Sequence, residues 1–106
     1  MDNFECIDIN KAKEMIDNGN VSVLDVRDPA SYEEAHIENA VFLTDQTVEH
    51  FIQSADKEKP LVCYCYHGMS SQNAAAFFVE NGFKNVYSLD GGFEAWRQVY
   101  PSVSGS

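Results

Sequence analysis

Basic residues are scarce in this chain. Seven lysines and arginines stand against 17 aspartates and glutamates in 106 residues, which gives a formal net charge of −10. A surface of this sign repels nucleic acid and anionic lipid, so we expect neither as a partner. A small anionic substrate would gain nothing from the overall field of the protein, and a local site would have to hold it.

Long apolar runs are also missing. No stretch comes near the ~20 residues that a membrane-spanning helix needs. The first ten residues, MDNFECIDIN, contain no lysine or arginine and so lack the basic start of a signal peptide. Three cysteines, an odd number, predict free thiols in a reducing compartment. We therefore expect a cytoplasmic protein without a membrane segment.

The sequence offers no complete set of metal ligands. Structural zinc takes four ligands, usually from pairs spaced as Cys-x2-4-Cys or His-x3-5-His. The spacing of Cys63 and Cys65 is tighter than that, and no second pair follows. The remaining candidates, Cys6, His36 and His50, fall on different predicted elements. We therefore predict no metal site.

Short apolar strands alternate with helices along the chain. The predicted strands are residues 4–9, 21–26, 40–43, 61–65 and 85–89, and the predicted helices are residues 11–18, 30–36, 45–55, 70–82 and 93–100. Asn10 is the expected N-cap of the first helix and Gly19 its end. This alternation predicts an α/β fold with a mostly parallel sheet and helices on both faces. We expect one domain, residues 1–101, followed by a flexible tail, residues 102–106.

The carboxyl end of the predicted strand 61–65 is the strongest candidate for a site, because ligands in such folds bind outside the carboxyl ends of the strands. Cys65 lies there, and the loop CYHGMSS leads into a helix that starts near Ser70. A short loop containing Gly68 can turn backbone N–H groups inward, and the helix N-terminus adds the positive end of its dipole. Such a nest binds anions and lowers the pKa of a cysteine at its centre. We therefore predict Cys65 as a nucleophile.

The neighbours of Cys65 admit simpler roles. Cys63 and Cys6 are expected to be buried core residues, because free cysteine behaves as a small hydrophobe. Ser70 and Ser71 are either N-cap residues or hydroxyl donors to the sulfur, and the sequence leaves both alternatives open. The side chains expected in solvent or at the rim of the pocket are Tyr66, His67 and Met69.

Three segments resemble the single-domain rhodaneses, most closely the small bacterial rhodaneses of the glycerol-3-phosphate regulon. VLDVRDPASYEEAHIENA at 23–40 is similar to the front segment of the family, with Asp25 and Arg27 after a buried strand. CYHGMSS at 65–71 stands in the place of the active-site loop, and YSLDGGFEAW at 87–96 in that of the closing segment. Together the three segments span nearly the whole chain in the order expected for the family.

The resemblance implies a rhodanese-like three-layer fold with a five-stranded sheet, and a thiosulfate sulfurtransferase activity. Cys65 would take the outer sulfur of thiosulfate as a persulfide and pass it to cyanide in assays or to a thiol such as that of thioredoxin in cells, without a metal or organic cofactor. Arg27 is either a structural partner of Asp25 or a substrate contact. The residues implied in substrate binding by the loop are Tyr66, His67, Gly68, Met69, Ser70 and Ser71.

The loop of this chain departs from the family at one point, and three alternative functions have to be compared with the sulfurtransferase. Many rhodaneses carry a basic residue in the loop, where this chain has Met-Ser-Ser at 69–71, so we expect weak binding of bulky or multiply charged anions.

A cysteine phosphatase would need an arginine six positions after the nucleophile, where Ser71 stands, so the sequence argues against a phosphatase. A non-catalytic binding module typically loses the cysteine, whereas Cys65 is present. A persulfide relay to a dedicated protein partner would use the same chemistry.

Overall fold

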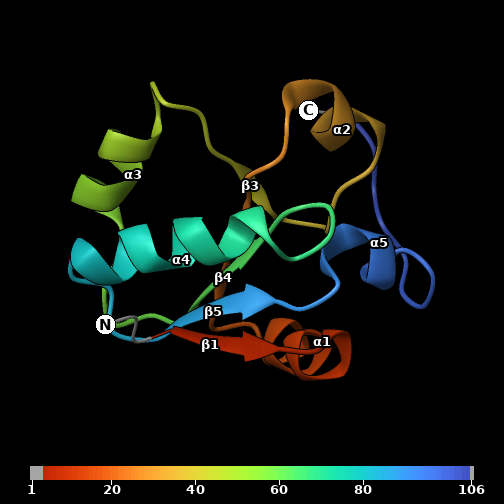
Figure 1. Cartoon of the computed structure of the whole chain (residues 1–106), viewed down its shortest axis with the longest axis horizontal. Coiled ribbons are helices and arrows are strands. Elements are labelled where there is room, and N and C mark those ends of the chain that lie inside the picture. Colours follow the sequence, from red (N-terminus) through yellow and green to blue (C-terminus); the bar gives the residue numbers. More distant parts are fainter. Residues whose placement is uncertain (1–3, 106) are drawn as a thin grey trace.

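The computed structural model describes residues 4–105, in which five strands alternate with five helices (Figure 1). The strands are β1 (Phe4–Ile7), β2 (Ser22–Asp25), β3 (Val41–Phe42), β4 (Leu61–Tyr64) and β5 (Val86–Leu89). The helices are α1 (Ile9–Asn18), α2 (Pro29–Glu34), α3 (Val48–Ser54), α4 (Ser70–Glu80) and α5 (Gly92–Trp96). Most elements are shorter at their ends than the sequence predicts.

The strands form one parallel sheet in the order β1-β5-β4-β2-β3. Each strand is followed by a helix or loop that returns the chain to the same end of the sheet, which makes every pairing parallel. The predicted α/β fold with a parallel sheet and helices on both faces is therefore confirmed. β4 lies at the centre of the sheet, between β5 and β2.

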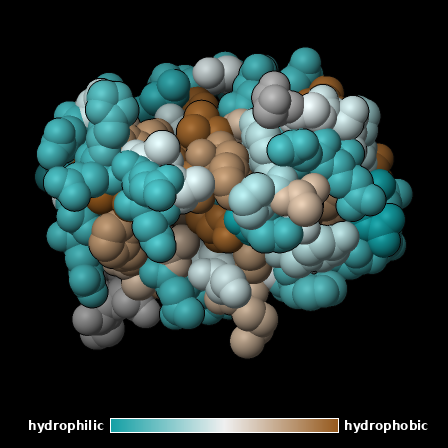
Figure 2. All heavy atoms as spheres, turned by 90° about the horizontal axis from the view of Figure 1, so that it is seen from above, coloured by the Kyte–Doolittle hydropathy of each residue, from teal (hydrophilic) through white to brown (hydrophobic). Residues whose placement is uncertain are grey.

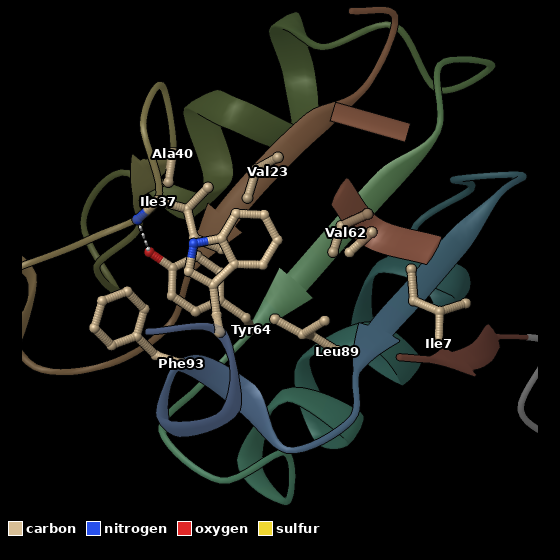
Figure 3. Close-up of a cluster of buried hydrophobic side chains, with 10 residues drawn as sticks. Ile7, Val23, Ile37, Ala40, Val62, Tyr64, Leu89 and Phe93 are labelled. Atoms are coloured by element: carbon tan, nitrogen blue, oxygen red, sulfur yellow. Dashed lines mark hydrogen bonds between the residues drawn. The ribbon is translucent and has the colours of Figure 1, made fainter. Parts of the chain in front are cut away.

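The two faces of β4 belong to different cores. Val62 and Tyr64 pack in a cluster with side chains of α1 and α5 (Figure 3), whereas Leu61 and Cys63 pack against α3 and α4. All four residues are buried, so the strand reads as a continuous apolar run in the sequence. The central strand is thereby held on both sides up to the residue that precedes Cys65.

Two local predictions need correction. The N-cap of α1 is Asp8 and not Asn10, because the Asp8 carboxylate accepts the backbone N–H of Lys11 at 2.8 Å. Gly19 ends the helix in the left-handed region, as predicted. Cys6 is exposed and not a core residue, because it lies in the edge strand β1 on the face opposite the buried Ile7. Cys63, by contrast, is fully buried as expected.

The segment expected to be a flexible tail is attached to the residues around the end of α2. Val103 and His36 exchange two backbone hydrogen bonds, of 2.8 and 2.9 Å, and Gly105 donates to the carbonyl of Glu33 at 2.8 Å. Figure 1 shows this end of the chain beside α2. Ser106 lies outside the described residues, and the flexibility of the tail stays a prediction.

Within residues 4–105, none of the helices has both the length and the apolar character needed to cross a membrane. In the same part of the chain, no three histidine, cysteine or acidic side chains converge as metal ligands would.

Candidate active site

Cys65 follows β4 directly and opens the loop that leads into α4. Because β4 is central, this loop stands at the carboxyl edge of the sheet between the ends of β2 and β5. The residue is 6% exposed, so its sulfur lies within the loop. The sequence predicted this position for the nucleophile.

Three hydrogen-bonding groups surround the sulfur. The backbone N–H of Gly68 donates to it at 3.1 Å and that of Ser71 at 3.3 Å. The hydroxyl oxygen of Ser71 lies 3.4 Å away. Gly68 has a φ of +94°, which L side chains rarely adopt, and a Cβ there would meet the backbone of Gly91 at 3.0 Å. The loop therefore forms the predicted nest, and glycine is required to close it.

The surroundings of Cys65 favour its thiolate. Burial raises the pKa of the thiol, but hydrogen bonds from the Ser71 hydroxyl and from the backbone N–H groups of Ser71, Gly68 and His67 outweigh it, so the pKa lies below its ordinary value. Within residues 4–105 Cys63 has no such donors, and burial raises its pKa to about 12. At neutral pH Cys65 is thus far the better nucleophile of the two.

The structure decides between the two roles considered for the serines. The N-cap of α4 is Met69, which makes no side-chain capping bond, so the N-cap interpretation of Ser70 and Ser71 is wrong. Ser71 is fully buried and contacts the sulfur, whereas Ser70 is exposed. The first turn of α4 presents one serine to Cys65 and the other to solvent, because consecutive residues of a helix face different directions.

The other loop side chains lie at the surface. Tyr66 and Met69 are 38% and 74% exposed, His67 is exposed as well, and the rings of Tyr66 and His67 lie 5.4 Å apart. All three side chains were expected in solvent or at the rim of the pocket, and the structure places them at the surface. Gln72 was not predicted to contribute, yet its side-chain amide donates to the carbonyl of Gly68 at 3.1 Å and so holds the turn of the loop.

The loop rests on the N-terminus of α5. Phe93 donates its backbone N–H to the carbonyl of Cys65 at 2.8 Å, and Glu94 donates to that of Tyr66 at 3.0 Å. A Cβ at Gly92 would come within 2.5 Å of the Cys65 carbonyl oxygen. Free N–H groups at the start of α5 therefore bind the outward-facing carbonyls of the loop, which leaves the N–H groups of the loop directed at the sulfur.

Arg27 is bound within the protein. Its guanidinium makes a bidentate ion pair with Asp25, with a shortest N···O distance of 2.7 Å, and donates to the carbonyl of Ala35 at 2.6 Å. Tyr64 donates its hydroxyl to Asp25 at 2.7 Å and accepts the N–H of Ile37, the bond drawn in Figure 3. The Arg27 side chain is 3% exposed. The predicted structural pair is present, and it ties the end of β2 to β4 and to the segment after α2.

Two hollows lie near the carboxyl ends of the strands. One, of about 400 Å³, lies between α2 and α5 and includes Arg27, Tyr66 and Arg97. Arg97 is paired with Glu94 at 2.8 Å, so both arginines of this hollow already face carboxylates. The other hollow, of about 340 Å³, lies between the end of β2, α3 and α4, and its lining is mostly apolar.

Proteins of known sequence and structure resemble the chain over nearly its whole length. The profile of the Rhodanese-like domain family matches residues 8–99. A "Thiosulfate sulfurtransferase GlpE" of Pseudomonas paraeruginosa is 50% identical over 101 residues, 95% of this chain and 91% of the relative, and that of Vibrio cholerae is 43% identical over 106 residues, all of both chains. A rhodanese-related protein from Thermoplasma volcanium has a TM-score of 0.80 at 26% identity, covering 94% of this chain and 98% of its own.

Proposed function

The chain belongs to the family of rhodanese-like domains, and on this premise we propose that it is a thiosulfate sulfurtransferase in which Cys65 carries the transferred sulfur. The observation that supports this function best is the sulfur of Cys65 inside a nest of N–H donors that favours its thiolate. Curated relatives of nearly equal length carry the same activity in their names. The free thiols of all three cysteines support a location in the reducing cytoplasm.

In the first half of the reaction, the Cys65 thiolate attacks the outer sulfur of thiosulfate. The bond between the two sulfur atoms of thiosulfate breaks, its electron pair leaves with sulfite, and the enzyme becomes a persulfide with its negative charge on the outer sulfur. We expect the backbone N–H groups from Tyr66 to Ser71 to hold this charge, because the N–H groups of Gly68 and Ser71 already donate to the Cys65 sulfur and the positive end of the α4 dipole lies there. No metal or organic cofactor enters the step.

In the second half, an acceptor takes the outer sulfur and restores the thiolate. Cyanide would leave as thiocyanate, and a thiolate such as that of thioredoxin would leave as a new persulfide. Both transfers conserve charge, since one anion attacks and another departs. Sulfite leaves and the persulfide remains before the acceptor reacts, so the sequence of steps is ping-pong.

The proposal predicts a stoichiometric release of sulfite. The purified, reduced protein with excess thiosulfate and no acceptor should release one sulfite per chain and then stop, because the persulfide cannot turn over alone. Adding cyanide should restart sulfite release and form thiocyanate in equal amount. A binding module without catalysis would release no sulfite under either condition, and that result would refute the proposal.

The site does not support the phosphatase alternative. The position where such enzymes hold an arginine is Ser71, whose side chain is buried against the sulfur. Arg27 and Arg97 flank the loop, but each is bound to a carboxylate. A doubly charged phosphate ester would therefore lack the bidentate cation that holds it in these enzymes.

The apolar hollow beside α4 supports a protein thiol as the acceptor in cells. Val26 in its lining donates a backbone hydrogen bond to Tyr64, the residue before Cys65, and Ala74 lies one helical turn beyond Ser71. Figure 2 shows apolar atoms at the centre of the face seen from above, between hydrophilic sides. Thiosulfate and cyanide are small and polar and gain no binding free energy from an apolar hollow. A thioredoxin cysteine with apolar neighbours can bury those neighbours in the hollow.

Replacing Phe77 by aspartate should separate the two acceptors. Phe77 lines the hollow and is 43% exposed, so the substitution places a charge in the proposed contact without opening the core. We expect kcat/KM with reduced thioredoxin to fall at least about tenfold, as at a central interface residue, while the rate with cyanide stays the same. Val99→Asp, at an exposed residue after α5, is the matched control. Equal losses with both acceptors, or none with thioredoxin, would rule out this surface.

A further inference from the structure

Ser88 is a polar residue inside a strand that is otherwise apolar. It lies in β5 next to Cys63 of β4 and is fully buried. Its hydroxyl lies 2.8 Å from that of Ser71, the side-chain contact that the structure gives it. Burying a hydroxyl group costs free energy unless it is hydrogen-bonded, and an alanine would fill the same place without this requirement. The pairing with Ser71 therefore needs an explanation beyond packing.

The two hydroxyls form a row that ends at the reacting sulfur. Ser88 contacts Ser71, and the Ser71 oxygen lies 3.4 Å from the sulfur of Cys65. A thiolate accepts hydrogen bonds and donates none, so with Cys65 ionised Ser71 must donate to the sulfur and accept from Ser88. With a neutral thiol the row can run the other way, from sulfur to Ser71 to Ser88. Both directions leave the Ser71 oxygen and proton bonded.

We propose that Ser88 is a positioning residue for the sulfur transfer, which orients the Ser71 hydroxyl according to the charge on the Cys65 sulfur. While the charge is on the sulfur, Ser88 donates to Ser71 and keeps the Ser71 proton on the thiolate. When the charge moves to the outer sulfur of the persulfide, Ser71 can turn its proton to the Ser88 oxygen, so the buried Ser71 proton keeps a hydrogen-bond acceptor. The inference rests on the proposed function only in taking Cys65 as the reacting residue.

Other groups around the sulfur do not provide this function. The elements around the sulfur, within residues 4–105, carry ten titratable or charged side chains: Asp25 in β2, Arg27 after it, Cys63 and Tyr64 in β4, Tyr66 and His67 in the loop, Glu80 in α4, Tyr87 in β5, Asp90 after β5 and Glu94 in α5. None of these side chains is hydrogen-bonded to the Cys65 sulfur in that range. Ser71 is thus the side-chain donor available to it, and Ser88 is the partner of Ser71.

A double-mutant cycle on the pH dependence of thiol reactivity tests the proposal. The rate at which iodoacetamide alkylates Cys65 is followed by mass spectrometry of the Cys65 peptide in wild type, Ser71→Ala, Ser88→Ala and the double variant. In Ser71→Ala the thiolate loses a hydrogen bond, and alkylation of Cys65 at pH 7 should be about tenfold slower than in wild type. In Ser88→Ala the hydroxyl of Ser71 loses its partner, and alkylation of Cys65 should be about threefold slower. In both variants the inflection of the pH profile of alkylation should move to higher pH. The double variant should match Ser71→Ala, because Ser88 acts through Ser71.

Val86→Ala, a buried change in the same strand, is the control for packing. It should lower the thermal stability and leave the pH profile of Cys65 unchanged. If Ser88→Ala has the wild-type profile, or if it slows alkylation equally with and without Ser71, the proposal is overturned. Alkylation needs no thiosulfate, so this result is independent of whether the protein transfers sulfur.

Discussion

Thiosulfate should add one sulfur atom to the wild-type chain and none to Cys65→Ser. We expect no added sulfur at all on the variant, because the persulfide forms on the sulfur atom that this change removes. A serine in the same nest stays a neutral hydroxyl and does not attack thiosulfate. Intact-protein mass after a brief incubation measures it. The added atom should disappear when cyanide is supplied.

Cys63→Ser is the matched control. Cys63 lies two residues away but is buried, and its raised pKa leaves it a thiol at neutral pH. This variant should gain the sulfur atom as the wild type does. Sulfur found on Cys65→Ser, or none on any reduced variant with fresh thiosulfate, would contradict the proposed mechanism.

The rate of sulfur uptake should also depend on pH with a definite sign. It should rise with pH as the thiolate forms and then level off. Because the nest holds the pKa of Cys65 below that of an ordinary cysteine, the plateau should begin at a lower pH than for a free thiol. In Ser71→Ala the plateau should begin at a higher pH, since one donor to the thiolate is lost.

Replacing Arg27 by methionine should have the largest effect on stability. The change leaves the fully buried carboxylate of Asp25 without its cation, which typically costs about 3–5 kcal/mol of the free energy of unfolding. Denaturant unfolding measures this loss. Arg97→Met removes a half-exposed arginine from its pair with Glu94 and should leave the free energy of unfolding nearly unchanged, because solvent screens an exposed ion pair.

The same variant tests whether Arg27 contacts the substrate. Under conditions where Arg27→Met is folded, it should take up sulfur from thiosulfate at nearly the wild-type rate, because its guanidinium is occupied by Asp25 and Ala35. A variant with wild-type stability and a strongly raised KM for thiosulfate would instead make Arg27 a substrate contact. Combining it with Asp25→Asn should recover part of the lost stability, since the buried charge is then removed.

Local patterns of the sequence predicted much of the fold. The apolar run of β4 and its alternation with helices predicted a parallel sheet, because a strand buried on both faces can carry few polar residues. The loop around Cys65 was predictable for a similar reason. Gly68 and the start of a helix follow Cys65 within a few residues, and a glycine turn before a helix N-terminus is a local arrangement that can direct N–H groups inward.

Contacts between distant segments depended on the tertiary structure. Ser88 meets Ser71 because β5 lies beside β4 and α4 covers both, and Gly92 meets Cys65 because α5 starts beside the loop. Cys6 is exposed because it lies in the edge strand β1 on the face opposite the buried Ile7. Hydrophobic periodicity specifies which face of an element is buried but not which element covers it. The nucleophile could therefore be found from the sequence, whereas the residues that orient its donors followed from the order of the strands.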